Sequence, residues 1–144
     1  QTHVLYYAPG QDMDNMKRQS YEFFGFLSLA LIVLSYIVLD RYTSWSPYRV
    51  WIAACSAATF AIYGLDKGIS KVNGARPPDK SLSRAPENLL HLLALVGGFP
   101  GGWLGMIFFG HKINFRKHPS IWFFLCLGTA LHVMLTKYHF FGAK

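Results

Sequence analysis

The sequence is poor in charged residues, and acidic residues are especially scarce. Charged residues make up 15% of the 144 positions, whereas 52% are hydrophobic and 17% are aromatic. A soluble domain normally carries about 25% charged residues. The composition therefore argues against a soluble domain and favours a chain embedded in a membrane.

Catalytic motifs are also lacking. The sequence has no nucleophile elbow, Walker loop, CxxC pair or HExxH zinc motif. Its two cysteines, Cys55 and Cys126, fall inside hydrophobic segments, where a small apolar filler is the usual role. Glu87 and His91 lie one helical turn apart, but two ligands do not make a metal site. We therefore assign no catalytic residue and no metal ligands.

Four hydrophobic stretches approach the length of about 20 residues that a helix needs to cross a bilayer. Backbone groups in lipid must be satisfied within the segment, so these stretches are expected to be helices. The prediction is an all-α integral membrane bundle of about four transmembrane helices, at about residues 22–40, 48–65, 87–109 and 120–138. A polar extension, residues 1–20, precedes this membrane domain of residues 21–144, and it does not resemble a cleavable signal peptide.

The third stretch contains the sequence GGFPGG and allows two paths. Its glycines recur at helical spacing: Gly97, Gly98, Gly101, Gly102 and Gly105. Such spacing predicts a groove on one face of a continuous helix, where another helix packs closely. Pro100 would kink that helix, and neighbours could satisfy the carbonyl it frees. The alternative is a re-entrant hairpin that turns back at GGFPGG; the glycine spacing favours the kinked crossing.

The distribution of basic residues predicts the orientation. With four plain crossings, Lys and Arg divide nine against five, which makes the N-terminus cytoplasmic. A re-entrant third segment would return the loop at residues 110–118 to the cytoplasm and change the division to ten against four. The net charge of +7 is thus explained by topology and by anionic lipid head groups, and nucleic acid is not an expected partner.

Ionisable residues gather at the predicted cytoplasmic side. Asp66 and Lys67 directly follow the second hydrophobic stretch and could pair with Arg84 or Glu87 at the membrane surface. Glu87 also suits the first turn of a helix, where the helix dipole favours a carboxylate. The candidate polar cluster consists of Asp66, Lys67, Arg84, Glu87, His91, His111, Lys112 and Arg116. Its basic members could bind lipid phosphates or could simply mark topology.

Two histidines, His91 and His132, lie inside hydrophobic segments. A neutral imidazole there could ligate a haem iron or a chlorophyll magnesium, although bonding to a neighbouring backbone is commoner. The cofactor therefore stays unknown. Tyr48 and Trp51 stand at the start of the second stretch, where an aromatic belt at the interface is expected.

Several short motifs follow one another in a fixed order. They are Tyr63-Gly64-Leu65-Asp66-Lys67, Arg84-Ala85-Pro86-Glu87, Leu89–Leu95 with His91, the paired glycines of GGFPGG with Gly105, Phe109, His111-Lys112 and Phe115-Arg116. This combination, over about residues 61–116, resembles the small bacterial membrane proteins grouped as domain of unknown function 1294. The resemblance implies a multi-pass protein of a bacterial inner membrane and no established activity. Ile113-Asn114 depart from the family pattern, which is usually richer in Thr and Lys there.

Two functional hypotheses follow. The first is a non-catalytic accessory subunit of a larger respiratory or photosynthetic membrane complex, which packs through its glycine-rich helix against other subunits. The alternative is a small membrane enzyme or transporter that acts on an anionic lipid or ion at the polar cluster. The alternative requires the side chains of that cluster to converge.

Overall fold

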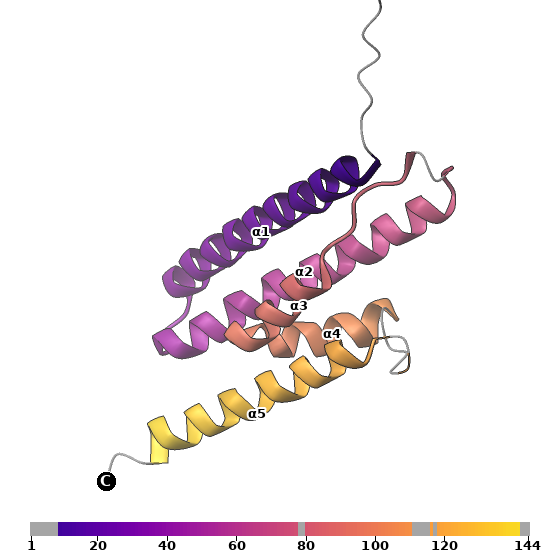
Figure 1. Cartoon of the computed structure of the whole chain (residues 1–144). Coiled ribbons are helices and arrows are strands. Elements are labelled where there is room, and N and C mark those ends of the chain that lie inside the picture. The colour runs from indigo at the N-terminus through magenta and orange to yellow at the C-terminus, as the bar shows by residue number, and fades with distance from the viewer. Residues whose placement is uncertain (1–8, 78–79, 111–115, 117, 142–144) are drawn as a thin grey trace, which may run out of the picture.

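The computed structural model describes residues 9–77, 80–110, 116 and 118–141, and all regular structure within them is helical. The elements are α1 (Pro9–Tyr42), α2 (Pro47–Gly74), α3 (Glu87–Leu93), the π-helical turn η2 (Ala94–Gly98), α4 (Phe99–Phe109) and α5 (Pro119–Phe141) (Figure 1). Three segments are long and apolar enough to cross a membrane: Asp14–Tyr42, Glu87–Phe109 and Pro119–Tyr138. The chain is thus an all-helical, multi-pass membrane protein.

Proline and glycine mark the helix boundaries. Pro47 occupies the start of α2, and Pro100 stands in the first turn of α4, positions where no N–H is needed for an intrahelical bond. Gly110, with φ of 55°, ends α4 in the left-handed conformation. Residues 9–20, expected as a polar extension, form the first turns of α1. The second predicted helix continues beyond residue 65 to Gly74.

The third hydrophobic segment folds back on itself. Its first arm, α3 and η2, runs antiparallel to α2, from the level of Asp66, where Ala85 binds, to the level of Trp51, which contacts Val96. The second arm, α4, returns parallel to α2, because Gly101 lies against Ser56, Gly105 against Tyr63 and Phe109 against Gly64. Figure 1 shows the two arms running in opposite directions between α2 and α5. The segment is a re-entrant hairpin.

The kinked crossing that the glycine spacing favoured is therefore not confirmed. The physical reason is the backbone at Gly97, whose φ of 133° is open to glycine but strained for other residues. A proline kink alone would have kept a single helix direction, whereas this conformation reverses it. The glycine groove exists, but the returning arm presents it to α2 of the same chain.

The reversal gives the bundle two distinct ends. The clamp end is where Asp66 of α2, the outer ends of both hairpin arms and the start of α5 lie. The tip end is where α2 begins, where the hairpin turns at Gly97 and where His132 of α5 lies. Early α1 lies at the clamp end, because Ser20 reaches the backbone of Arg84.

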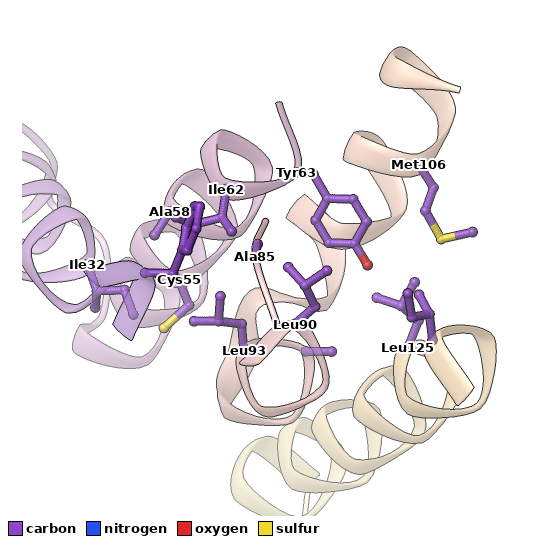
Figure 2. Close-up of a cluster of buried hydrophobic side chains, with 13 residues drawn as sticks. Ile32, Cys55, Ala58, Ile62, Tyr63, Ala85, Leu90, Leu93, Met106 and Leu125 are labelled. Atoms are coloured by element: carbon purple, nitrogen blue, oxygen red, sulfur yellow. The ribbon is translucent and has the colours of Figure 1, made fainter. Parts of the chain in front are cut away.

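The core joins all four helical units. Figure 2 shows Ile32 of α1, Ile62 of α2, Leu90 of the hairpin and Leu125 of α5 pointing into one shared interior. These side chains are buried together with Tyr63, Met106 and small residues such as Ala58. The small residues allow the hairpin to enter between α2 and α5. The outward faces of α1 and α5 remain apolar and exposed, as expected for contact with lipid.

The hairpin makes a testable statement about the C-terminus. α2 is less apolar than the three segments named above, but it is 28 residues long and packs between α1 and the hairpin, so we count it as a crossing. With α1, α2 and α5 as crossings, the two termini lie on opposite sides of the membrane, whereas four crossings would put them on one side. We expect alkaline phosphatase fused after Lys144 to be active outside the cytoplasm, and a fluorescent protein fused there to be dark. If the phosphatase were inactive after Lys144 but active when fused within the loop at residues 110–118, the result would instead support a full third crossing.

Candidate functional site

The clamp end is organised by one buried carboxylate. The side chain of Asp66 is 0% exposed. Its Oδ1 accepts hydrogen bonds from Arg84 Nε and from the backbone N–H of Ala85, both at 3.2 Å, and its Oδ2 accepts one from Arg84 Nη2 at 3.1 Å. The predicted pairing of Asp66 with Arg84 is therefore confirmed. A forked guanidinium and a backbone donor satisfy the carboxylate that burial removes from water.

The Asp66–Arg84 pair holds the loop before α3 on the bundle. The loop residues Arg84 and Ala85 bind α2 through Asp66, and the hydroxyl of Ser20 on α1 donates to the carbonyl of Arg84 at 2.6 Å. Asn73, near the end of α2, exchanges two hydrogen bonds with the backbone of Leu82, at 2.7 and 2.8 Å. The entry to the hairpin is thus fixed to two helices.

A second polar contact links the hairpin to the start of α5. Glu87 Oε1 lies 2.7 Å from His118 Nδ1, and both side chains are half-buried. Glu87 stands in the first turn of α3, as predicted from the helix dipole. The pair joins the start of the hairpin to the residue that precedes α5. The sequence offered no signal for this partner, because the two residues are far apart along the chain.

The other described members of the predicted cluster are Lys67, His91 and Arg116. Lys67 is half-buried on α2, and Arg116 is exposed between the hairpin and α5. His91 stacks on Phe124 of α5 at a ring-centroid distance of 4.4 Å. His111 and Lys112 lie outside the described residues. The structure therefore brings together Asp66 with Arg84 and Glu87 with His118, all at the clamp end.

The tip of the hairpin has its own polar contacts. Pro100 has no N–H for the carbonyl four residues earlier, that of Val96. The indole N–H of Trp51 donates to that carbonyl at 2.8 Å. Trp51, expected in an aromatic belt, thus replaces a missing backbone donor. A bare carbonyl at membrane depth would be costly, so this contact is needed for the turn.

His132 satisfies the neighbouring carbonyl. Its Nε2 lies 2.9 Å from the carbonyl oxygen of Leu95, and its Nδ1 lies 2.8 Å from the hydroxyl of Tyr48. Because a carbonyl can only accept, Nε2 carries the proton, and Nδ1 accepts from Tyr48 in the neutral ring. Both nitrogens are engaged, so a haem iron or chlorophyll magnesium would have to displace one of these contacts. The geometry fits a structural histidine that joins α2, the tip and α5.

Replacement of His132 by Phe tests this role. The ring would stay but the donor to Leu95 would be lost, and we expect a loss of about 1–3 kcal/mol of unfolding free energy. Tyr48→Phe removes only the hydrogen bond between the Tyr48 hydroxyl and His132 Nδ1, and it should cost about 0.5–1.5 kcal/mol. Thermal unfolding in detergent measures both. Equal stability of His132→Phe and wild type would show that the tip does not depend on this contact.

The glycines of the hairpin are occupied inside the chain. A Cβ at Gly101 would overlap the backbone carbonyl of Ser56, and one at Gly98 would overlap the hydroxyl of Thr59. Gly105 faces Tyr63, where a Cβ would lie 2.7 Å from the side chain. Gly102 faces Leu125 of α5 instead. The close-packing surface is therefore used by α2 and α5 and is not open to another subunit.

Fold and site together define a multi-pass helical membrane protein with a re-entrant hairpin. The Asp66–Arg84 pair holds the hairpin at the clamp end. At the tip end, Trp51 and His132 bind the backbone carbonyls that lack a helical partner at the turn. Within the described residues, no group of three or more His, Cys, Asp and Glu could hold a metal ion. Residues 56–118 match the model of a family described as a protein of unknown function (DUF1294), which confirms the resemblance noted in the sequence. Neither the curated proteins nor the solved structures provide a significant match. The matched segment runs from α2 through the hairpin to the start of α5.

Proposed function

We propose that the chain is a non-catalytic accessory subunit of a larger bacterial membrane complex, respiratory or photosynthetic. The observation that supports this proposal is that its buried polar side chains bind other parts of the same chain. Asp66, Arg84 and His132 each make contacts that hold the hairpin, and the Asp66 carboxylate is fully buried. A reactive group that must reach a substrate is not expected to be sealed in this way.

The surface offered to other subunits is then the outer face of α4. Ile107 and Phe108 are 70% and 72% exposed there, and Phe108 packs edge-on against Phe60 of α2 at 6.0 Å. Rigid aromatic side chains on a fixed helix give contact area at low entropic cost. This replaces the glycine face, which the sequence had suggested and the chain itself fills.

The orientation follows from charge. The hairpin puts Phe109 and His118, which bound the next loop, at the clamp end. If the basic residues of that loop are counted on this side, Lys and Arg divide ten against four in favour of the clamp end. We place the clamp end and the N-terminus in the cytoplasm of a bacterial inner membrane on this basis. The partners of the chain are then anionic lipids and neighbouring membrane subunits, with no role for nucleic acid.

Gentle detergent extraction from native membranes, native gel separation and mass spectrometry test the subunit role. We expect the chain to migrate with a large assembly, whose absorption spectrum names the host. Phe108→Ala should weaken that co-migration, while Phe123→Ala on exposed α5 serves as the matched control. A lone, colourless species of small size from native membranes would contradict the proposal.

One observation favours the enzyme or transporter as a second candidate. Glu87 and His118 form a half-buried pair between the hairpin and α5, at the cationic end of the bundle. Such a pair could pass a proton or meet an anionic head group. Proton or anion flux into vesicles that contain the purified chain, lost in Glu87→Gln, would favour this candidate over the accessory subunit.

A further inference from the structure

The re-entrant path leaves a hollow beside the tip. α2 and α5 pack against the hairpin, and the hairpin turns back at Gly97. Beside this turn, parts of early α2 and late α5 line an open space together with the start of the returning arm. A hollow of about 890 Å³ lies there, bounded by early α2, by Phe99 and Pro100 of the hairpin and by late α5. We call it the tip hollow.

The tip hollow has apolar walls and two cations. Ile52, Pro100 and Val133 contribute to its walls, and Arg49 and Lys137 contribute from α2 and α5. Arg49 precedes Ser56, which also lines the hollow, by about two helical turns, so the hollow extends roughly 10 Å along α2. This span is too short for a crossing helix of another protein, which needs about 30 Å. It suits a flexible hydrocarbon chain.

The charges at this end are one-sided. Only four of the 14 Lys and Arg residues belong to the tip end, and Arg49 and Lys137 are two of them. Asp40 is the one acidic residue that the topology assigns to this end, and it does not line the hollow. The positive-inside rule does not require basic residues on this side. The local charge is therefore complementary to an anionic head group.

We propose that the tip hollow binds an anionic phospholipid of the outer leaflet. One acyl chain lies along Ile52, Pro100 and Val133, and the phosphate lies between Arg49 and Lys137. The acyl chain then covers the parts of α2 and α5 that line the hollow. The lipid would thus be a structural ligand of the re-entrant fold, separate from any protein partner on α4.

Native mass spectrometry of the purified chain tests the site, with dioleoyl phosphatidylglycerol and dioleoyl phosphatidylcholine as probes. Each interfacial cation favours an anionic lipid by about fivefold, so we expect a preference for phosphatidylglycerol of about five- to 25-fold. The double variant Arg49→Gln/Lys137→Gln should lose that preference. Arg41→Gln, on the same side but outside the hollow, should keep it.

A second variant tests the apolar part separately. Val133 is exposed and lines the hollow, so Val133→Trp fills the space without a change in charge. We expect it to weaken the binding of both lipids, while circular dichroism shows an intact fold. Equal binding of the two lipids by the wild type, or unchanged binding in both variants, would overturn the proposal. A dimer that Val133→Trp dissociates would also overturn it, because a second copy would then occupy the hollow.

Discussion

Replacing Gly101 by alanine should prevent the hairpin from docking on α2. The added methyl group would overlap the backbone carbonyl of Ser56, and backbone atoms cannot move aside as a flexible side chain can. Overpacking of this kind costs about 3 kcal/mol or more. The effect is intramolecular, so we expect loss of the folded chain itself and not only loss of a subunit contact.

Gly68→Ala is the matched control for this change. Gly68 lies within the helix α2, as Gly101 lies within α4, but a Cβ at Gly68 would meet nothing within 4 Å. Alanine should therefore be neutral or stabilise by up to about 1 kcal/mol. The unfolding midpoint and the elution profile in detergent report both variants. If Gly101→Ala were as stable as Gly68→Ala, the hairpin would not pack on α2 as described.

Replacing Arg84 by methionine should be the most damaging change at the clamp end. Asp66 is fully buried, and the change removes the guanidinium whose Nη2 lies 3.1 Å from its Oδ2. Loss of one partner of a buried pair costs about 3–5 kcal/mol, and we expect about 2–4 because the Arg84 side chain is 45% exposed. Asp66→Asn keeps an acceptor for Ala85 and should cost less, about 1–2 kcal/mol.

Two further variants separate the buried pair from ordinary surface charge. The double variant Arg84→Met/Asp66→Asn removes the stranded charge and should be more stable than Arg84→Met alone. Arg18→Met breaks an exposed pair with Glu22, at 2.9 Å, and should change stability by less than about 1 kcal/mol. Urea or heat unfolding in detergent gives the comparison. If Arg18→Met and Arg84→Met lowered the unfolding free energy by similar amounts, the Asp66–Arg84 pair would have no special structural role.

The helical class and the membrane location could be predicted because they depend on segment length and apolarity alone. The path of the third segment could not, because it depends on one backbone angle at Gly97. Glycine at that position is compatible both with a helix and with the φ of 133° that reverses the chain. Charge counting favoured the hairpin slightly and the glycine spacing favoured a crossing, and the spacing proved to describe packing against α2.

The candidate site was partly predictable for the same kind of reason. Asp66 and Arg84 are only 18 residues apart and flank the loop expected after the second hydrophobic stretch, so the sequence suggested their pairing. Glu87 with His118, and His132 with Leu95, join segments that only the fold brings together. Trp51 was assigned to the interface on residue type, and its contact with Val96 follows from the hairpin. The sequence did not decide between a crossing and a hairpin, so the contacts that depend on the hairpin could not be predicted from it.

The contacts at the hairpin tip also have an order in time, because the chain is made from its N-terminus. Trp51 is synthesised before the tip and is present when Val96 leaves the ribosome, whereas His132 follows Leu95 by 37 residues. Until α5 enters the membrane, the Leu95 carbonyl lacks its partner from that helix. Insertion of the last helix therefore completes the hairpin, and a nascent chain that stops at residue 118 would carry an unfinished tip.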